Sequence, residues 1–180
     1  MIKIIIPNTY LPERKYIINI LFGEFLGLEY GINVEDGAKD YEIVLEKTKK
    51  LIIKDSFFSN FIDGLSYLDK KNLPEKINIL KNQFIVEKDI PVIYGDDEFK
   101  IEENEIVCGI DIFASSFFML TRWEGYVDKT RDKRNRFPAN ASLAYKCDFL
   151  NRPIVNEYVE MLWNILEFLG IRQKRKEKKY

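Results

Sequence analysis

The sequence predicts a single α/β domain in which helices flank a mixed β-sheet. An apolar, β-branched segment at the start of the chain precedes an amphipathic helical pattern, which is the usual opening of an α/β unit. Several short strand-like segments follow, and two strongly apolar helical patterns lie in the second half of the chain. A length of 180 residues suits one domain and can bury a core. We expect this domain to span residues 1–171.

The first half of the chain contains most of the predicted strands. Residues 2–6 form a β-branched run stopped by Pro7, and apolar side chains then recur at helical spacing over residues 16–28. Further strand candidates are residues 29–34, 41–45 and 51–53. Residues 57–68 are apolar without clean periodicity, so we expect irregular structure with a helical turn or two.

The second half contains a predicted hairpin and a buried helix. Residues 90–94 read as a buried strand that ends at a Gly-Asp-Asp turn, and residues 99–102 and 105–108 alternate like the arms of a hairpin. Asp111 suits a helix N-cap, because its carboxylate can accept a hydrogen bond from a free N–H of the first turn. The helix that follows is apolar on nearly every side, which is typical of a buried helix, and it is too short to span a bilayer.

The clearest amphipathic helix begins at Arg152 and Pro153, presents one apolar face and ends near Gly170. Between the two apolar helices, residues 128–138 form a polar loop. Residues 172–180 contain six cations and one anion. We therefore expect a basic flexible tail that is solvated and not needed for folding.

Composition excludes several classes of function. The formal net charge is −1, so nothing draws the whole chain to nucleic acid, and we expect neither nucleic-acid binding nor a membrane span. The sequence contains no histidine, which excludes zinc sites with histidine ligands and the Ser-His-Asp and Cys-His arrangements. No glycine-rich phosphate loop follows the first strand. We therefore predict no cofactor, no metal site and no catalytic residue.

Cysteine usage and the N-terminus favour a cytoplasmic location. Cys108 and Cys147 are too few for a disulfide framework. Cys108 lies in an apolar run, so we expect it to be a small buried side chain. The apolar segment at the N-terminus is too short for a signal peptide.

The best candidate site begins where the buried helix ends. Arg122, Trp123, Glu124 and Tyr126 can anchor the helix end to the core, and the alternative is a binding contact. The loop that follows carries a net charge of +3, from five cations and two aspartates over residues 128–136. It is either a solvated surface loop or a contact site for anions or carboxylates. In the second case Arg131, Arg134 and Arg136 supply the planar guanidinium groups.

Other acidic residues lie in predicted turns, where turn chemistry explains them. The aspartates that we assign to turns in this way are Asp36, Asp40, Asp96 and Asp97. The less favoured alternative for Asp96 and Asp97 is to supply oxygen ligands to a divalent cation.

Five segments together resemble one region of certain bacterial proteins. They are residues 111–126, 132–133, 136–138, 142–144 and 152–155. The region is an uncharacterised domain that lies N-terminal to the catalytic domain in polysaccharide deacetylase family proteins. This chain departs from the pattern at Gly125, where the family has a second glutamate, and at Arg134 and Asn135, where it often has His-Gly.

The resemblance implies a non-catalytic accessory module of a polysaccharide-deacetylase-type protein. Such a module positions the catalytic domain, in cis or in trans, or helps to bind a glycan. The metal-assisted deacetylation itself uses aspartate and histidine ligands in the related catalytic domains, so we expect no enzyme activity from this chain alone. Residues 172–180 would then begin a linker to a catalytic domain outside this chain. The alternatives are a freestanding interaction or scaffold protein and a small-molecule-binding α/β domain.

Overall fold

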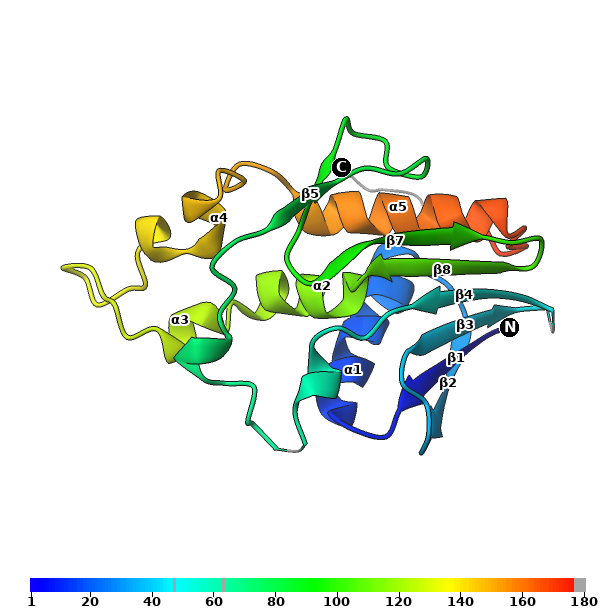
Figure 1. Cartoon of the computed structure of the whole chain (residues 1–180), viewed down its shortest axis with the longest axis horizontal. Helices are drawn as coiled ribbons and strands as arrows, with labels where there is room; N and C mark the ends of the chain where they lie inside the picture. The colour runs from blue at the N-terminus through cyan, green and yellow to red at the C-terminus, as the bar shows by residue number, and fades with distance from the viewer. Residues whose placement is uncertain (47, 63, 177–180) are drawn as a thin grey trace.

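A six-stranded mixed sheet forms the body of the computed structural model, with strand order β2-β1-β3-β4-β8-β7 (Figure 1). The structure describes residues 1–46, 48–62 and 64–176. The strands are β1 (Ile2–Pro7), β2 (Tyr30–Glu35), β3 (Tyr41–Leu45), β4 (Lys49–Ile53), β7 (Gly95–Ile101) and β8 (Glu105–Ile110). The predicted fold class, a layered α/β domain with a mixed sheet, is confirmed.

Strand direction places the ends of four strands at one edge of the sheet. β1 runs parallel to β2, and β4 runs parallel to β8. β3 is antiparallel to both β1 and β4, so β1, β2, β4 and β8 all point the same way. We call the edge where these four strands finish the carboxyl edge. The residues that follow each strand, among them Asn8, Asp36, Lys54 and Asp111, are therefore gathered along it.

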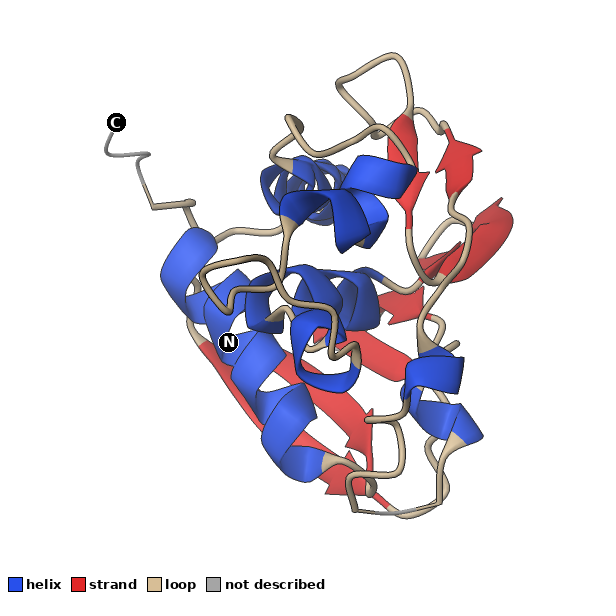
Figure 2. Ribbon diagram, turned by 90° about the vertical axis from the view of Figure 1, so that its left-hand side faces the viewer, coloured by secondary structure: helices blue, strands red, loops and turns tan. Residues whose placement is uncertain are grey.

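The main helices lie against one face of the sheet (Figure 2). They are α1 (Leu11–Ile18), which continues as the π-helix η1 (Asn19–Phe25), and α2 (Ile112–Thr121), with α5 (Ile154–Phe168) packed on α2. The strands alternate accordingly: in β3, Tyr41, Ile43 and Leu45 are buried, whereas the side chains between them are only half-buried. The core thus fills the space between the helices and a single face of the sheet.

Helix α2 is the buried centre of this core, as the sequence predicts. Asp111 caps it by accepting a hydrogen bond from the Ala114 N–H at 2.9 Å. Phe113 of α2 is fully buried and contacts Tyr41 of the sheet, with ring centroids 4.4 Å apart, and also Phe22 of η1. One helix therefore ties the sheet to the N-terminal helical layer.

Shorter elements complete the fold. They are η2 (Phe58–Asn60), η3 (Lys70–Asn72), α3 (Glu124–Val127), η4 (Ala139–Ala141), α4 (Leu143–Lys146), and the strands β5 (Asn78–Leu80) and β6 (Ile90–Val92). The predicted strand over residues 90–94 is buried, but β6 pairs with β5 in a separate two-stranded sheet. The turn predicted at residues 95–97 is wrong, because β7 already begins at Gly95, with a register irregularity before Phe99.

The described part of the basic tail contacts the body of the domain. Arg175 forms two hydrogen bonds with the Glu160 carboxylate, at 2.8 and 2.7 Å. The Lys176 N–H donates to the Leu26 carbonyl at 2.8 Å, close against Gly27, where a β-carbon would lie only 2.6 Å from the Lys176 side chain. These contacts differ from the expected solvated tail, because the Arg175 guanidinium pairs with a carboxylate and the Lys176 backbone N–H bonds to a carbonyl of the body. That the tail is not needed for folding stays a prediction. Residues 177–180 lie outside the described residues.

Among residues 1–46, 48–62 and 64–176, no helix is long and apolar enough to cross a bilayer.

Candidate functional site

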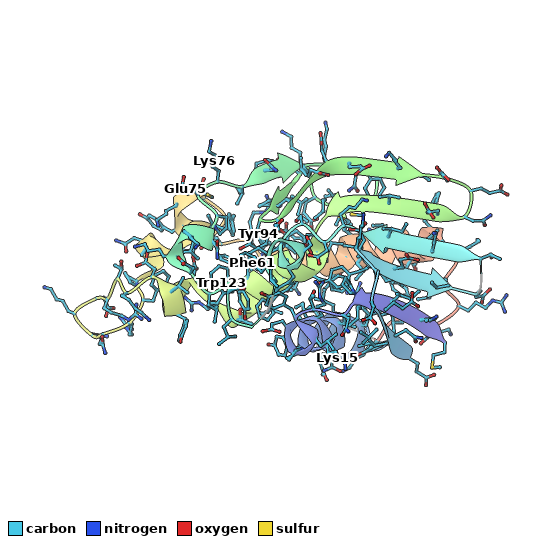
Figure 3. All side chains as sticks on the ribbon, turned by 60° about the horizontal axis from the view of Figure 1, so that its bottom comes forward. Lys15, Phe61, Glu75, Lys76, Tyr94 and Trp123 are labelled. Atoms are coloured by element: carbon cyan, nitrogen blue, oxygen red, sulfur yellow. The ribbon has the colours of Figure 1, made fainter. Side chains whose placement is uncertain are left out.

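At the end of α2, two of the predicted site residues are structural anchors. Trp123 is 4% exposed and packs on Phe57 and Phe118. Figure 3 shows its label beside those of Phe61 and Tyr94, which contact the same Phe57 ring. Trp123 therefore holds the start of α3 in the aromatic part of the core.

Glu124 joins α3 to α4. Its carboxylate accepts a hydrogen bond from the Leu143 N–H, at the start of α4, at 2.9 Å. The carboxylate is buried, and this burial raises the pKa of Glu124 above its ordinary value. The contact lies inside the fold, so the role of Glu124 is to hold α3 and α4 together.

The other two helix-end residues face solvent. Arg122 ends α2 in the left-handed conformation, with φ at 51°. Its guanidinium has no hydrogen-bond or ion-pair partner among the described residues. The Tyr126 ring is 63% exposed, and the Lys129 ammonium lies over it, 4.7 Å from the ring centroid. This end of the domain therefore presents a cation and an aromatic ring to whatever approaches it.

Asp132 organises the basic loop from within. One of its oxygens accepts hydrogen bonds from the Arg134 and Arg136 backbone N–H groups, at 2.8 and 3.0 Å. The other oxygen accepts from the Arg136 guanidinium at 3.1 and 2.9 Å. The Arg136 hydrogen bonds hold the pKa of Asp132 below its ordinary value.

The three predicted contact arginines consequently differ in availability. Arg131 donates to the carbonyls of Asp128 and Gly125, at 2.8 and 3.0 Å, and so clamps the loop to α3. Arg136 is engaged by Asp132. All three arginines are exposed. Of the three, only Arg134 makes no side-chain hydrogen bond or ion pair within the described part of the chain.

Arg122, Arg131 and Arg136 come together around an open pocket of about 670 Å³, which we call the basic-loop pocket. Trp123, Glu124, Tyr126 and Arg134 do not line it. Phe137 lies so close to Gly125 that a β-carbon there would be 3.1 Å from the ring. A glutamate at position 125, as in the resembling family, would therefore require Phe137 to move.

A second pocket, of about 660 Å³, lies at the carboxyl edge, and sequence reasoning missed it. We call it the carboxyl-edge pocket. Its residues come from the turn after β1, the turn between β2 and β3, the segment after β4, and α1. The lining residues are Pro7, Asn8, Thr9, Arg14, Asp36, Ala38, Lys39, Asp40, Lys54, Asp55, Ser59 and Phe61.

A fully buried ion pair lies at the base of the carboxyl-edge pocket. The Arg14 guanidinium donates to the Asp55 carboxylate at 2.6 Å, and both side chains have no exposed surface. It also donates to the Tyr41 hydroxyl and the Thr9 carbonyl, at 2.5 and 2.6 Å. Burial opposes the charge on Arg14, but Tyr41 and Asp55 outweigh it, and the pKa of Arg14 is raised.

Asp111 lies behind this pair and connects α2 to the segment after β4. Besides capping α2, its carboxylate accepts hydrogen bonds from the Ser56 N–H and hydroxyl, at 2.9 and 3.3 Å. Burial, and then the charge of Asp55, raise the pKa of Asp111 to about 7, although the two backbone N–H bonds act in the opposite direction. The carboxyl edge therefore contains a buried carboxyl group whose environment disfavours its ionisation.

We expect stability to depend on this carboxyl. A carboxyl whose pKa is higher in the folded state stabilises the fold at low pH, and this contribution is lost as the pH rises through the folded pKa. The free energy of unfolding should thus fall between about pH 4 and pH 7. In Asp111→Asn, which keeps a hydrogen-bond acceptor but cannot ionise, this dependence should be much flatter. Urea unfolding at several pH values measures it.

Asp111→Ala is the control for the cap itself. It removes the acceptor as well as the charge. Because neither variant ionises at this position, Asp111→Ala should be less stable than Asp111→Asn by about 1–2 kcal/mol at pH values on both sides of the window. Parallel pH profiles for the wild type and Asp111→Asn would show that Asp111 is not the titrating group.

Sequence reasoning missed the carboxyl-edge pocket because it assigned Asp36 and Asp40 to turn chemistry. One signal was available: polar residues directly follow the β1, β2, β4 and β8 segments. This pattern predicts a site only when those four strands are known to run in the same direction, because only then do the polar residues meet at one edge of the sheet. Of the described residues, no group of three histidine, cysteine, aspartate or glutamate side chains is placed to hold a metal ion. Cys108 is buried as predicted, and burial raises its pKa to about 12.

One family model matches the chain: DUF7033, a family of unknown function, covers residues 2–170. No curated protein and no solved structure matches the chain.

Proposed function

We propose that this chain, which belongs to the family of unknown function DUF7033, is a non-catalytic accessory module of a polysaccharide-deacetylase-type protein. The contact surface in this proposal is the end of the domain that carries the basic-loop pocket. It docks the catalytic domain, in cis or in trans, or helps to hold a glycan.

The observation that carries the proposal is that some side chains of this region bond within the basic loop, whereas others are left without partners. Arg131, Arg136 and Asp132 satisfy one another or the local backbone, which fixes the loop without using the guanidinium groups of Arg122 and Arg134. A surface that is already ordered loses less conformational entropy on binding. The two remaining guanidinium groups can each form bidentate hydrogen bonds with a carboxylate.

The segments that resemble the deacetylase-associated domain support the same location. They include the end of α2, α3, parts of the basic loop and the start of α4. Several of their contacts are internal, such as Glu124 to Leu143 and Phe137 against Gly125. These residues therefore build a platform for the exposed groups beside them.

The double variant Arg122→Ala/Arg134→Ala tests the docking surface. Hydrogen bonds to charged groups contribute about 1.5–3 kcal/mol each, so affinity for the partner should fall at least roughly tenfold. Both side chains are exposed, and stability should change by less than about 0.5 kcal/mol. Calorimetric titration with a deacetylase-type catalytic domain, and separately with acetylated amino-sugar oligomers, at two salt concentrations measures the effect.

A matched control removes the same amount of charge elsewhere. Lys15→Ala/Lys81→Ala also loses two exposed cations and should bind like the wild type. Equal affinity of the Arg122/Arg134 variant and the wild type would exclude this surface as the contact. If the wild type binds neither the catalytic domain nor the oligomers, the freestanding interaction protein is the better account.

The same proposal predicts that the chain alone releases no acetate from acetylated amino-sugar oligomers, with or without added zinc. The sequence supplies no imidazole ligand, and a hydrolytic zinc site needs three protein ligands and an open position. Acetate release is measured by a coupled assay over hours. Release that requires metal and stops on chelation would overturn the non-catalytic assignment.

A further inference from the structure

We propose that the carboxyl-edge pocket binds a small zwitterion with one carboxylate and one ammonium group, the chemistry of an amino acid. This inference concerns a different surface from the basic-loop pocket and does not depend on the docking proposal.

The position of the pocket favours a ligand. In open α/β sheets, ligands bind in the crevice beyond the carboxyl ends of the strands. Here β1, β2 and β4 finish beside the pocket, and α1 begins there. The volume, about 660 Å³, lies in the range of small-molecule sites.

The interior of the pocket is rigid and electrically balanced. Arg14 pairs with Asp55 at 2.6 Å, and Lys54 pairs with Asp40 at 3.1 Å. The Asp40 carboxylate also accepts a hydrogen bond from the Asp55 N–H at 3.0 Å, which links the two ion pairs. A buried ion pair is costly to desolvate and adds little net stability, but it fixes geometry. The base of this pocket therefore offers fixed polar groups and no excess charge.

The rim, by contrast, carries one charge of each sign that is not neutralised. One Asp36 oxygen accepts a hydrogen bond from the Asn8 amide at 2.6 Å, but no cation of the described residues pairs with this carboxylate. The Lys39 ammonium has no partner there either, and both residues are exposed.

A ligand that complements this rim needs both charges. Its ammonium group would pair with Asp36, and its carboxylate would pair with Lys39 and with the remaining N–H groups of Lys54. A simple anion would leave Asp36 unpaired, and a simple amine would leave Lys39 unpaired. Phe61, Ala38 and Pro7 supply an apolar part of the wall, which suits the side chain of an amino acid.

The test uses the whole chain and ligands that differ by one charged group. Thermal-shift measurements with each of the twenty amino acids at 10 mM select the best ligand, and calorimetry gives its affinity. We expect binding by at least one amino acid, and much weaker binding by its decarboxylated amine and by its deaminated acid. Glucose at the same concentration tests a neutral polyol in place of a zwitterion.

Two single variants test the assigned residues. Asp36→Asn and Lys39→Gln each remove one exposed charge without touching the buried pairs, and each should weaken binding at least roughly tenfold. Lys15→Gln removes a charge from α1 outside the pocket, on a side chain that Figure 3 labels, and should leave affinity unchanged. Circular dichroism confirms that each variant is folded.

The proposal is overturned if no amino acid binds, if the amine, the acid or glucose binds as well as the amino acid, or if both Asp36→Asn and Lys39→Gln bind like the wild type. None of these results bears on the basic-loop pocket. Conversely, failure of the Arg122/Arg134 experiment leaves this inference intact.

Discussion

Replacing Arg14 by methionine will destabilise the protein by about 3–5 kcal/mol, because the substitution leaves the Asp55 carboxylate buried without its counter-charge. Both side chains of the pair are fully buried. Arg14 also donates hydrogen bonds to the Tyr41 hydroxyl and the Thr9 carbonyl. The substitution therefore also removes the bonds that join α1 to β3 and to the turn after β1. Urea unfolding followed by circular dichroism will show the loss as a lower midpoint.

The double variant Arg14→Met/Asp55→Asn separates two contributions to this loss of stability: the lost ion pair itself, and the cost of leaving the Asp55 carboxylate buried without a counter-charge. Removing both charges takes away the uncompensated carboxylate, so a large part of the lost stability should return. The introduced amide keeps an oxygen that can still accept the hydrogen bond that the Ser59 N–H donates to Asp55. If Arg14→Met alone changes the free energy of unfolding by less than about 1 kcal/mol, water or another cation reaches Asp55, and the pair is not buried in solution.

Phe117→Ala should cost about 3–5 kcal/mol, which is typical for removing a phenylalanine from a packed core. Phe117 is 6% exposed, and its ring contacts Tyr16, Phe58 and Tyr67. These rings come from α1, η2 and the segment after it. The cavity would therefore loosen the contact of α2 with two separate parts of the chain.

Leu120→Ala is the matched control, because Leu120 lies on the same helix but is 38% exposed. Its removal should cost well below half of the Phe117→Ala effect. The two midpoints are compared by denaturant unfolding under identical conditions. Equal midpoints for Phe117→Ala and the wild type would place Phe117 outside the core.

Local signals predicted the elements with strong patterns. The Asp111 cap and the apolar face of α5 follow from residue type and spacing, and both are confirmed. β5 has three residues, two of them exposed, so it gives no pattern to recognise. The break between α1 and η1 depends on a change of hydrogen bonding that helical spacing does not reveal.

Long-range pairing was beyond the reach of the sequence. Arg14 lies in a helix, where a lone arginine is expected to face solvent, and its partner Asp55 is 41 positions away. Strand order decides that the two meet, and no local signal gives that order. The basic loop was predicted as a polar loop between the two apolar helices. Its internal bonding was not, because Asp132 reaches Arg136 only through a turn in which Asn135 adopts φ of 56°.

The long connection between β4 and β8 has a consequence for the timing of folding. β8 pairs with β4 in parallel, and α2 follows β8 directly. During synthesis from the N-terminus, β1 to β4 can therefore form while the inner side of Tyr41 still lacks its cover, Phe113. A nascent chain that pauses before α2 leaves the ribosome exposes this apolar sheet face. Because such exposed intermediates aggregate, we expect chains that end within the β4–β8 connection to be recovered as insoluble protein.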